Sequence, residues 1–559
     1  MLSGPRLLPL YSRLLPLYLC CALAPLGCAA QAPASNAVHC AIQPARAATE
    51  ADRAFAAGDW ARAEGLYAAQ LAGPAAAANY AGVVKSQLEQ NKLTEALATA
   101  QRDATALPAS ADAQALVGDV LLRSGQIPEA GTAYTKAVTL DPCGARGQFG
   151  LGRLSDLTSH RATAARKFAA AHTLAPGDPE IAAAFFATRP AAQRADGLRA
   201  LLASSPVLGP GTVERLTNQL AALDQHKSCT VEQPFASARL ELAPLMYDGV
   251  YVRSWGLKVR LDDAQTPLLE LDSSVSGIVL SQKDAQHAGL HPLTTIPASA
   301  DATYMAVADR VRIGTLEYHD CPVRVVPASV LADGNSLIGT DFFRDHLIHI
   351  DYVARLLSLD PFPAPLGSLM QASSTPTDPY IAPEEKDWSP VYIAGSNILI
   401  PTFINKQGPY CFLLDTGTDR TILSPAVAAL LGAEKTATLD LQGTSGTIVK
   451  VLPREGGGDT QVTRVRGPDG TLLHVTTPVK LPVYRFTNNE MPDVFAISFD
   501  LSPKSRDIGF EVSGVMGFYV LRNYFIDLNY RDGLVKILYD QNQRYRAREG
   551  EKRTLNLAY

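Results

Sequence analysis

Two segments of the chain place one aspartate between two runs of apolar residues, a pattern typical of a carboxylate in a tight turn between buried strands. Residues 411–424 read CFLLDTGTDRTILS around Asp415, and residues 268–281 read LLELDSSVSGIVLS around Asp272. Two carboxylates about 3 Å apart cannot both ionise, so such a pair holds one proton between them. One member can take a proton from water while the other polarises a carbonyl. The pattern thus predicts acid–base hydrolysis by two similar units.

A second shared block follows each aspartate. Residues 337–339 (LIG) in the first copy match residues 515–517 (VMG) in the second, and a tyrosine follows at the same distance, Tyr352 and Tyr530. The spacing between the copies grows by about 35 residues from the first block to the second, which indicates an insertion in the second copy. We predict that this insertion includes residues 453–473 and forms an extended hairpin.

Both copies resemble lobes of retropepsin-like aspartic proteases of the bacterial type that carries two such units in one chain. The family pattern is two apolar residues with Asp-Thr/Ser-Gly, a glycine-rich flap hairpin, and then two apolar residues with glycine. The second copy has all three, with 443–446 (GTSG) as the flap tip. The resemblance implies two mainly β lobes, a catalytic pair of Asp272 and Asp415, and no metal or organic cofactor. It also implies a reciprocal hydrogen-bond grip by Ser273 and Thr416, and supporting or flap roles for Ser274, Gly417, Gly443 and Gly446.

The first copy departs from this pattern at Ser274, which stands where the family has glycine. Serine adopts most backbone angles of glycine unless φ is positive, so this residue weakens the catalytic interpretation without excluding it. Residues 297–311 contain no glycine for a flap. Tyr304 is the only aromatic residue there; it lies either over the cleft as a flap residue or, in the interpretation we favour, in an ordinary strand.

Upstream of the two copies the chain is rich in alanine with helical spacing, and it repeats. A spacing of 34 residues relates Pro74, Pro108, Pro142 and Pro176, as well as Gly118 to Gly152 and Tyr134 to Phe168. These units resemble tetratricopeptide repeats, with small residues where two helices touch and a proline ending each unit. Four units and a less regular fifth would form an all-α solenoid, capped by residues 211–225. The resemblance implies a concave face that recruits a protein partner or substrate.

The amino terminus predicts export. Arg6 and Arg13 precede an apolar run that ends before Cys28, and this run is too short and too rich in proline to span a membrane. Residues 26–28 resemble a lipoprotein signal, so lipidation at Cys28 and ordinary cleavage near residues 30–32 both stay open. The protein is therefore expected in the periplasm, outside the cell, or lipid-anchored on the outer face of a bacterial membrane. Six cysteines from Cys28 onward permit fifteen disulfide connectivities.

Composition and charge fit several domains without nucleic-acid binding. The chain has 559 residues, which exceeds one core, and a net charge of −5 provides no basic surface for nucleic acid. The boundaries that we predict are a signal peptide over 1–30, helical repeats over 46–225, a first lobe over 235–362, a proline-rich linker over 363–390, a second lobe over 391–541, and a tail over 542–559.

The sequence thus predicts a helical solenoid followed by two acid-protease lobes, and an exported aspartic endopeptidase acting on polypeptides. Two alternatives stay open. The first is a catalytically inactive peptide-binding or scaffold protein, favoured by Ser274 and the glycine-free flap. The second is a site formed across a homodimer by the second lobe alone, which we rank lower because Asp272 is present in the same chain.

Overall fold

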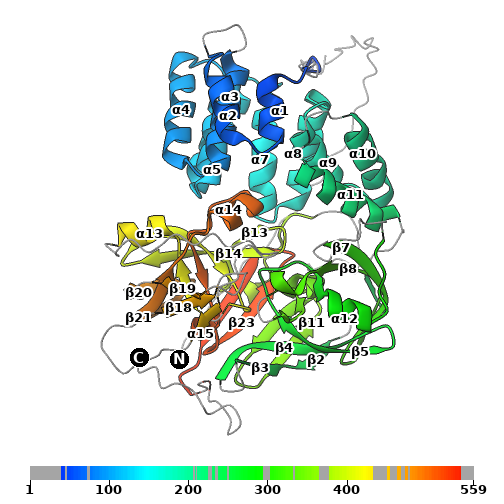
Figure 1. The fold of residues 1–559 in the computed structure, drawn as a ribbon. Coiled ribbons are helices and arrows are strands. Elements are labelled where there is room, and N and C mark those ends of the chain that lie inside the picture. Colours follow the sequence, from blue (N-terminus) through cyan, green and yellow to red (C-terminus); the bar gives the residue numbers. More distant parts are fainter. Residues whose placement is uncertain are drawn as a thin grey trace, which may run out of the picture. The chain divides into compact units, whose positions relative to one another are not determined.

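The computed structural model places most of the chain beyond residue 39 (Figure 1). The residues that it describes are 40–43, 47–71, 76–204, 208, 210–224, 229–232, 237–247, 251–293, 303–331, 334–363, 377–418, 420–431, 450–452, 463–466, 472–475, 479–542 and 545. The predicted signal peptide with Cys28, the flap glycines Gly443 and Gly446, and most of the predicted tail lie outside these residues.

The described residues between 50 and 224 form consecutive helix pairs. The pairs are α1 (Glu50–Ala56) with α2 (Trp60–Ala68), α3 (Ala76–Glu89) with α4 (Leu93–Ala106), α5 (Ala111–Arg123) with α6 (Ile127–Leu140), α7 (Ala145–Leu157) with α8 (Arg161–Leu174), and α9 (Pro179–Ala187) with α10 (Ala191–Ser204). A last helix, α11 (Pro210–Asp224), follows them. This arrangement confirms the predicted solenoid of tetratricopeptide type.

Small residues allow the two helices of a pair to approach closely, as the repeat spacing predicted. A Cβ atom on Gly118 of α5 would lie 2.7 Å from the ring of Tyr134 on α6. A Cβ atom on Gly152 of α7 would likewise lie 2.7 Å from the ring of Phe168 on α8. Both rings are buried. The 34-residue spacing therefore marks a glycine that fits under an aromatic ring in successive pairs.

The first lobe is built on an eight-stranded sheet. Its strands are β1 (Thr230–Val231), β3 (Ala243–Tyr247), β4 (Tyr251–Leu261), β5 (Ala264–Leu271), β6 (Ile278–Ser281), β7 (Tyr304–Ile313), β8 (Leu316–Val326) and β9 (Leu337–Ile338). The short helices are α12 (Gln282–His287), η1 (Ala328–Val330) and η3 (Thr340–Phe343). Strand β9 pairs in parallel with β5 and antiparallel with β6, while β6 pairs in parallel with β8.

The second lobe repeats this topology in a seven-stranded sheet. Its strands are β13 (Tyr392–Ala394), β14 (Asn397–Ile404), β15 (Gln407–Leu414), β16 (Thr421–Leu423), β20 (Val479–Phe486), β21 (Asn489–Ser498) and β22 (Gly514–Met516), and its helices are α13 (Pro425–Leu430), α14 (Ser502–Ile508) and α15 (Phe518–Leu521). Strand β22 pairs in parallel with β15 and antiparallel with β16, and β16 pairs in parallel with β21. The equivalent pairings confirm that the two lobes are duplicates of one fold.

The insertion of the second lobe forms a small separate sheet. Its strands are β17 (Lys450–Leu452), β18 (Thr463–Arg466) and β19 (Leu472–Val475). Strand β18 pairs antiparallel with both neighbours, so this part of the chain contains the hairpin that the glycine and proline pattern predicted.

The two lobes also share a six-stranded sheet in the order β12, β24, β23, β10, β11, β2. These strands are β2 (Ala238–Glu241), β10 (Leu347–Asp351), β11 (Leu356–Asp360), β12 (Ser389–Pro390), β23 (Tyr524–Asn529) and β24 (Leu534–Tyr539). The antiparallel pair of β10 and β23 joins the lobes, and His349 lies opposite Asp527 across it. The predicted linker therefore ends inside this sheet, because Ser389–Pro390 forms β12.

The helical repeats and the second lobe share one apolar core. Leu122 and Ile127 of the repeats belong to the same buried cluster as Leu413 and Val515, which flank the Asp415 turn in the lobe. Beside this core, Arg123 of α5 forms an ion pair with Glu511 over 3.2 Å, with the two side chains only 7% and 18% exposed. The sequence predicts a recruiting solenoid, but none of its patterns predicts this shared core.

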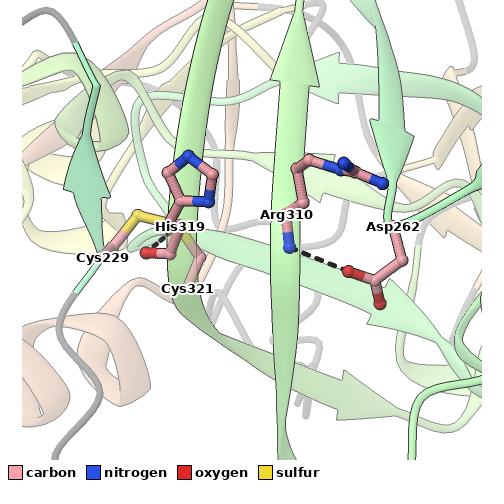
Figure 2. The surroundings of a disulfide bond; sticks show 5 residues. All are labelled: Cys229, Asp262, Arg310, His319 and Cys321. Carbon is pink, nitrogen blue, oxygen red and sulfur yellow. Dashed lines mark hydrogen bonds between the residues drawn. A yellow bond between two sulfur atoms is a disulfide. The ribbon is translucent and has the colours of Figure 1, made fainter.

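A disulfide bond links the entry of the first lobe to its central hairpin (Figure 2). Cys229 precedes β1 and pairs with Cys321 of β8. On the neighbouring strand, the backbone N–H of Arg310 donates to Asp262 Oδ1 over 2.8 Å. Cys411 is a free, buried thiol.

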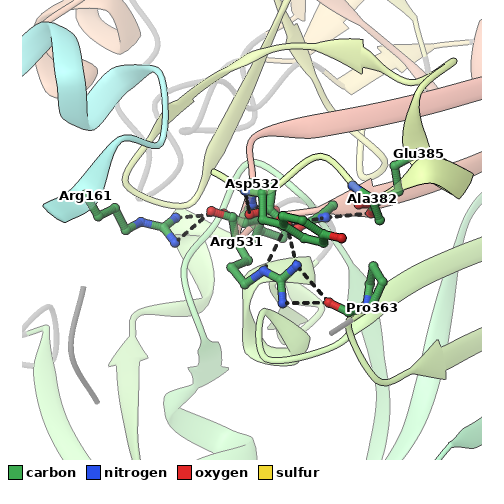
Figure 3. A network of polar contacts seen from close by, with 9 residues as sticks. Arg161, Pro363, Ala382, Glu385, Arg531 and Asp532 are labelled. Carbon is green, nitrogen blue, oxygen red and sulfur yellow. Dashed lines mark hydrogen bonds and ion pairs between the residues drawn. The ribbon is translucent and has the colours of Figure 1, made fainter. Parts of the chain in front are cut away.

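The connection between the lobes contacts the turn that follows β23 at two points (Figure 3). The guanidinium of Arg531 donates to the carbonyl of Pro363 over 3.4 Å. The carboxylate of Asp532 accepts from the N–H of Tyr380 over 3.0 Å. From the repeats, Arg161 donates to the carbonyl of Tyr530 over 2.7 Å. One turn of the second lobe thus contacts the repeats, the start of the linker at Pro363, and the linker again at Tyr380.

Candidate active site

Each aspartate follows the last residue of a strand buried in the centre of its lobe. Asp272 follows β5, and its N–H donates to the carbonyl of Ile338 on β9 over 3.0 Å. Asp415 follows β15, and its N–H donates to the carbonyl of Met516 on β22 over 3.1 Å. The apolar pairs of the second sequence block thus hold the aspartate turns through backbone hydrogen bonds.

The glycine of the second block is required because the aspartate turn passes close to it. A Cβ atom on Gly339 would lie 2.5 Å from the carbonyl oxygen of Val275, and one on Gly517 would overlap the carbonyl of Arg420. Any larger residue would push the turn away from the strand. The apolar-apolar-Gly pattern therefore indicates that, in each lobe, the strand before this glycine lies close to the aspartate turn.

The two turns are joined by a reciprocal set of hydrogen bonds. The N–H of Ser273 donates to Thr416 Oγ1 over 3.0 Å, and the N–H of Thr416 donates to Ser273 Oγ over 3.1 Å. Each hydroxyl then donates across to the other lobe, Ser273 to the carbonyl of Leu414 and Thr416 to that of Leu271, both over 2.7 Å. The structure therefore contains the predicted grip, formed within one chain and fully buried.

Ser274 keeps the contact that glycine makes in the other lobe. Its N–H donates to Asp272 Oδ1 over 2.8 Å, and its hydroxyl donates to the same oxygen over 2.7 Å. The φ angle of Ser274 is not positive, so the backbone needs no glycine at this position. In the second lobe the N–H of Gly417 donates to Asp415 Oδ1 over 3.0 Å. Ser274 thus adds a donor to its aspartate.

Asp415 receives a similar set of donors, one of which the sequence analysis missed. Thr418 donates its N–H to Oδ1 over 2.9 Å and its hydroxyl to Oδ2 over 2.7 Å. Asp415 is 1% exposed, whereas Asp272 is 8% exposed. Burial, and then the neighbouring charge of Asp272, raises the pKa of Asp415 from its ordinary 3.8 to about 7, although the Thr418 bonds act in the opposite direction. Asp415 therefore keeps its proton to a higher pH than an ordinary aspartate does.

The two aspartate turns lie in close contact. A Cβ atom on Gly417 would lie 2.7 Å from Cγ of Asp272 and 2.8 Å from its Oδ2. Gly417 therefore leaves the space that the carboxylate of the opposite lobe occupies. The two loops are in contact, both carboxylates accept hydrogen bonds, and the charge of Asp272 acts on Asp415, as is expected of two neighbouring carboxylates.

A buried lysine beside the pair was not singled out in the sequence. Lys504 of α14 is 2% exposed, and its Nζ donates to the carbonyl of Ser274 over 3.0 Å. Burial lowers the pKa of this lysine, whereas nearby carboxylates that include Asp272 and Asp415 act to raise it. No spacing pattern in the sequence places α14 next to the first lobe's turn, so only the tertiary fold could reveal this contact.

The flap candidates remain predictions. Gly443 and Gly446 lie outside the described residues. Tyr304 is the first residue of β7, pairs with Val325 of β8, and packs half-buried against the core of the lobe. Its position is that of a strand tyrosine, the interpretation that the sequence analysis favoured.

Comparisons with known proteins find similarity among solved structures. No protein-family model matches the chain, and no curated protein matches it. Among solved structures, a thermophilic TPR protein of Thermus thermophilus is 17% identical, with a TM-score of 0.26, and the match covers 31% of this chain and 95% of that one. MamA is 15% identical with a TM-score of 0.20, over 32% of this chain and 96% of that one. A tetratricopeptide repeat protein from Parabacteroides merdae is 15% identical with a TM-score of 0.20, over 31% of this chain and 71% of that one.

Two further features bear on the sequence-based expectations. Within the part of the chain that the structure describes, no helix is both long and apolar enough to cross a membrane. Tetratricopeptide-type repeats such as those of α1–α10 generally bind protein partners.

Proposed function

We propose that the protein is an aspartic endopeptidase whose site is the pair of Asp272 and Asp415. The observation that supports this most strongly is the grip of Ser273 and Thr416, because its four hydrogen bonds fix the two aspartate turns in one relative position. Hydrolysis by two carboxylates depends on such positioning, since one proton must pass between fixed groups.

The burial of the two carboxylates suggests a role for each. Asp272, as the ionised base, takes a proton from a water molecule, and the water oxygen attacks the carbonyl carbon of the peptide bond. Asp415, as the acid, gives its proton to the carbonyl oxygen. The tetrahedral intermediate then loses the amine, which takes up the proton held by Asp272, and the second hydroxyl of the intermediate returns a proton to Asp415. The pair thus regains its single proton after each cycle.

This assignment sets the expected pH dependence. The pair works while Asp415 holds its proton, and the pKa of Asp415 is raised to about 7. Activity is therefore expected at acid to neutral pH and should fall as the pH rises above this value. At the acid end it should fall once the pair holds two protons, because no carboxylate is then left to act as the base.

We further propose that the helical repeats recruit the polypeptide substrate or a protein partner. Because α5–α7 share a core with the second lobe, a partner bound to the repeats would be held at a fixed distance from the aspartate pair. Nucleic acid and organic cofactors have no part in this proposal.

Export remains part of the proposal, with the protein in the periplasm, outside the cell, or anchored through a lipid on Cys28. The Cys229–Cys321 disulfide supports an oxidising location, since disulfides are rare in reducing compartments.

The test is cleavage of an unstructured protein over a range of pH by the mature chain and three variants. Asp272→Asn and Asp415→Asn should both be inactive. Asp284→Asn is the matched control, because Asp284 is a buried aspartate of the first lobe outside the two turns, and it should stay active. Loss in Asp415→Asn alone would instead indicate a site formed between two copies of the chain.

The second candidate function is a peptide-binding or scaffold protein without catalysis. The low exposure of both carboxylates favours it, because an attacking water needs access to them. A folded wild-type chain that cleaves nothing at any pH would establish this alternative.

A further inference from the structure

Lys504 is a buried cation that one lobe extends to the aspartate turn of the other. It belongs to α14 of the second lobe, and its Nζ reaches the carbonyl of Ser274 in the first lobe over 3.0 Å. Burying an ammonium group is costly unless it is paired, so such a lysine needs a compensating interaction. The residue is 2% exposed, and the structure provides the compensation at the proposed active site.

This lysine breaks the symmetry between the lobes. In the second lobe α14 lies between β21 and β22, and the equivalent segment of the first lobe lies between β8 and β9. Residues 327–336 of that segment read PASVLADGNS and contain no lysine or arginine. The segment of the first lobe that corresponds to α14 therefore has no counterpart of Lys504, which lies next to the turn in which serine replaces glycine.

The charged groups around Lys504 come from α14, from β8 and from the two aspartate turns. They are Asp507 on α14, Arg324 on β8, and the two site aspartates. Asp507 and Arg324 carry opposite charges, so their effects on the lysine oppose each other. Of the two site carboxylates, Asp272 acts more strongly on Lys504 than Asp415 does. A cation in this position favours the ionised form of the pair, and its charge acts to lower the pKa of Asp415 against the burial that raises it.

Resting on the proposed function, we propose that Lys504 is a positioning residue for the aspartate pair. Its ammonium holds the Ser274 carbonyl, so that the N–H and hydroxyl of Ser274 stay on Asp272 Oδ1. Lys504 itself exchanges no proton with the substrate. Ser274 and Lys504 together thus replace, in the first lobe, the glycine turn that the second lobe has at Gly417.

The test compares the pH profile of kcat/KM for wild type, Lys504→Met, Lys504→Gln and Arg506→Met on reduced, carboxymethylated serum albumin. Lys504→Met removes the charge and the hydrogen bond. Lys504→Gln removes the charge but keeps a donor, and it serves as the second variant if the first does not fold. Arg506→Met removes a cation from the same helix. The guanidinium of Arg506 lies over the ring of Trp60 in the repeats.

Both Lys504 variants should move the acid limb of the profile to higher pH, because the pair loses a nearby cation and the fixed donors of Ser274, both of which favour an ionised carboxylate. A displacement of about one pH unit lowers kcat/KM about tenfold on the acid limb and leaves the neutral region less affected. Arg506→Met should keep the wild-type limb. An equal loss at every pH in the Lys504 variants would overturn the inference, since that is the result of a merely structural role.

A second measurement separates this inference from the proposed function. Carboxyl ¹³C NMR of aspartate-labelled protein, assigned with Asp272→Asn and Asp415→Asn, follows the two titrations without any substrate. If the wild type cleaves nothing but the Asp272 titration moves to higher pH in Lys504→Gln, the positioning role holds and the protease proposal fails. If that titration is unchanged in Lys504→Gln, the positioning role is refuted, whatever the activity.

Discussion

Replacing Asp415 by asparagine should abolish activity and at the same time stabilise the fold at neutral pH. The pKa of Asp415 is raised from 3.8 to about 7, first by burial and then by the charge of Asp272. Asparagine is close to the protonated acid in shape and carries no charge. The native fold of the variant therefore avoids the cost of ionising a buried carboxyl group.

The magnitude follows from the linkage between proton binding and stability. Between the unfolded pKa and the folded pKa the native state holds a proton that the unfolded state has lost, so the free energy of unfolding falls as the pH rises. Each pKa unit corresponds to about 1.4 kcal/mol. The wild type should lose about 4 kcal/mol of stability from Asp415 between about pH 4 and about pH 7, and this loss should level off above that range.

The assay is chemical denaturation of wild type and Asp415→Asn at a series of pH values, with the difference in unfolding free energy plotted against pH. The difference should be small at acid pH and rise in favour of the variant towards neutral pH. Because the charge of Asp272 acts on Asp415, the curve belongs to the pair, and Asp272→Asn provides the second curve. A difference that is flat with pH, or one that favours the wild type at neutral pH, would refute the reasoning that Asp415 is buried with its proton.

Three further predictions concern the parts that hold the site. The hydrogen bond to Asp527 of β23 raises the pKa of His349. The stability that protonated His349 contributes is therefore present below the ordinary histidine pKa of about 6.5 and is lost as the pH rises through the pKa of the folded state. In His349→Gln this component of the stability–pH curve should disappear. Gly417→Ala places a Cβ atom 2.7 Å from Cγ of Asp272, so we expect loss of cleavage and about 1–3 kcal/mol of destabilisation in denaturant titrations. Arg123→Met leaves Glu511 buried without its ion-pair partner and should lower the melting temperature, with a free-energy cost of about 3–5 kcal/mol; restored stability in the double variant with Glu511→Gln would confirm that this pair is the cause.

The duplication could be predicted from sequence because each of its signals is local. An aspartate between two apolar runs and a later apolar-apolar-Gly block are required by strands that bury both faces and by a close backbone approach, as Gly339 and Gly517 demonstrate. The helical repeats were equally predictable, because the glycine-to-aromatic contact of Gly118 and Tyr134 recurs at a fixed spacing. These features depend on neighbours in sequence or on a repeated unit.

Ser274 illustrates a partial prediction. The sequence identified it as the departure from the family pattern but left its effect open, because that effect depends on φ and on the distance to Asp272. The structure supplies both: φ is not positive, and the serine donates twice to the carboxylate. The local backbone geometry therefore decides whether the substitution damages the turn or supports it.

The sequence by itself determined the fold of the repeats, the two-lobed architecture and the pair of aspartates with their supporting hydroxyls. Only the tertiary structure decided how these parts meet. The shared six-stranded sheet, the common core of α5–α7 with the second lobe, and the contact of Lys504 with Ser274 each join segments that are far apart in the chain. Such contacts have no period and no local motif, because they arise from the packing of completed surfaces, and that packing sets the environment and the proton affinity of the aspartate pair.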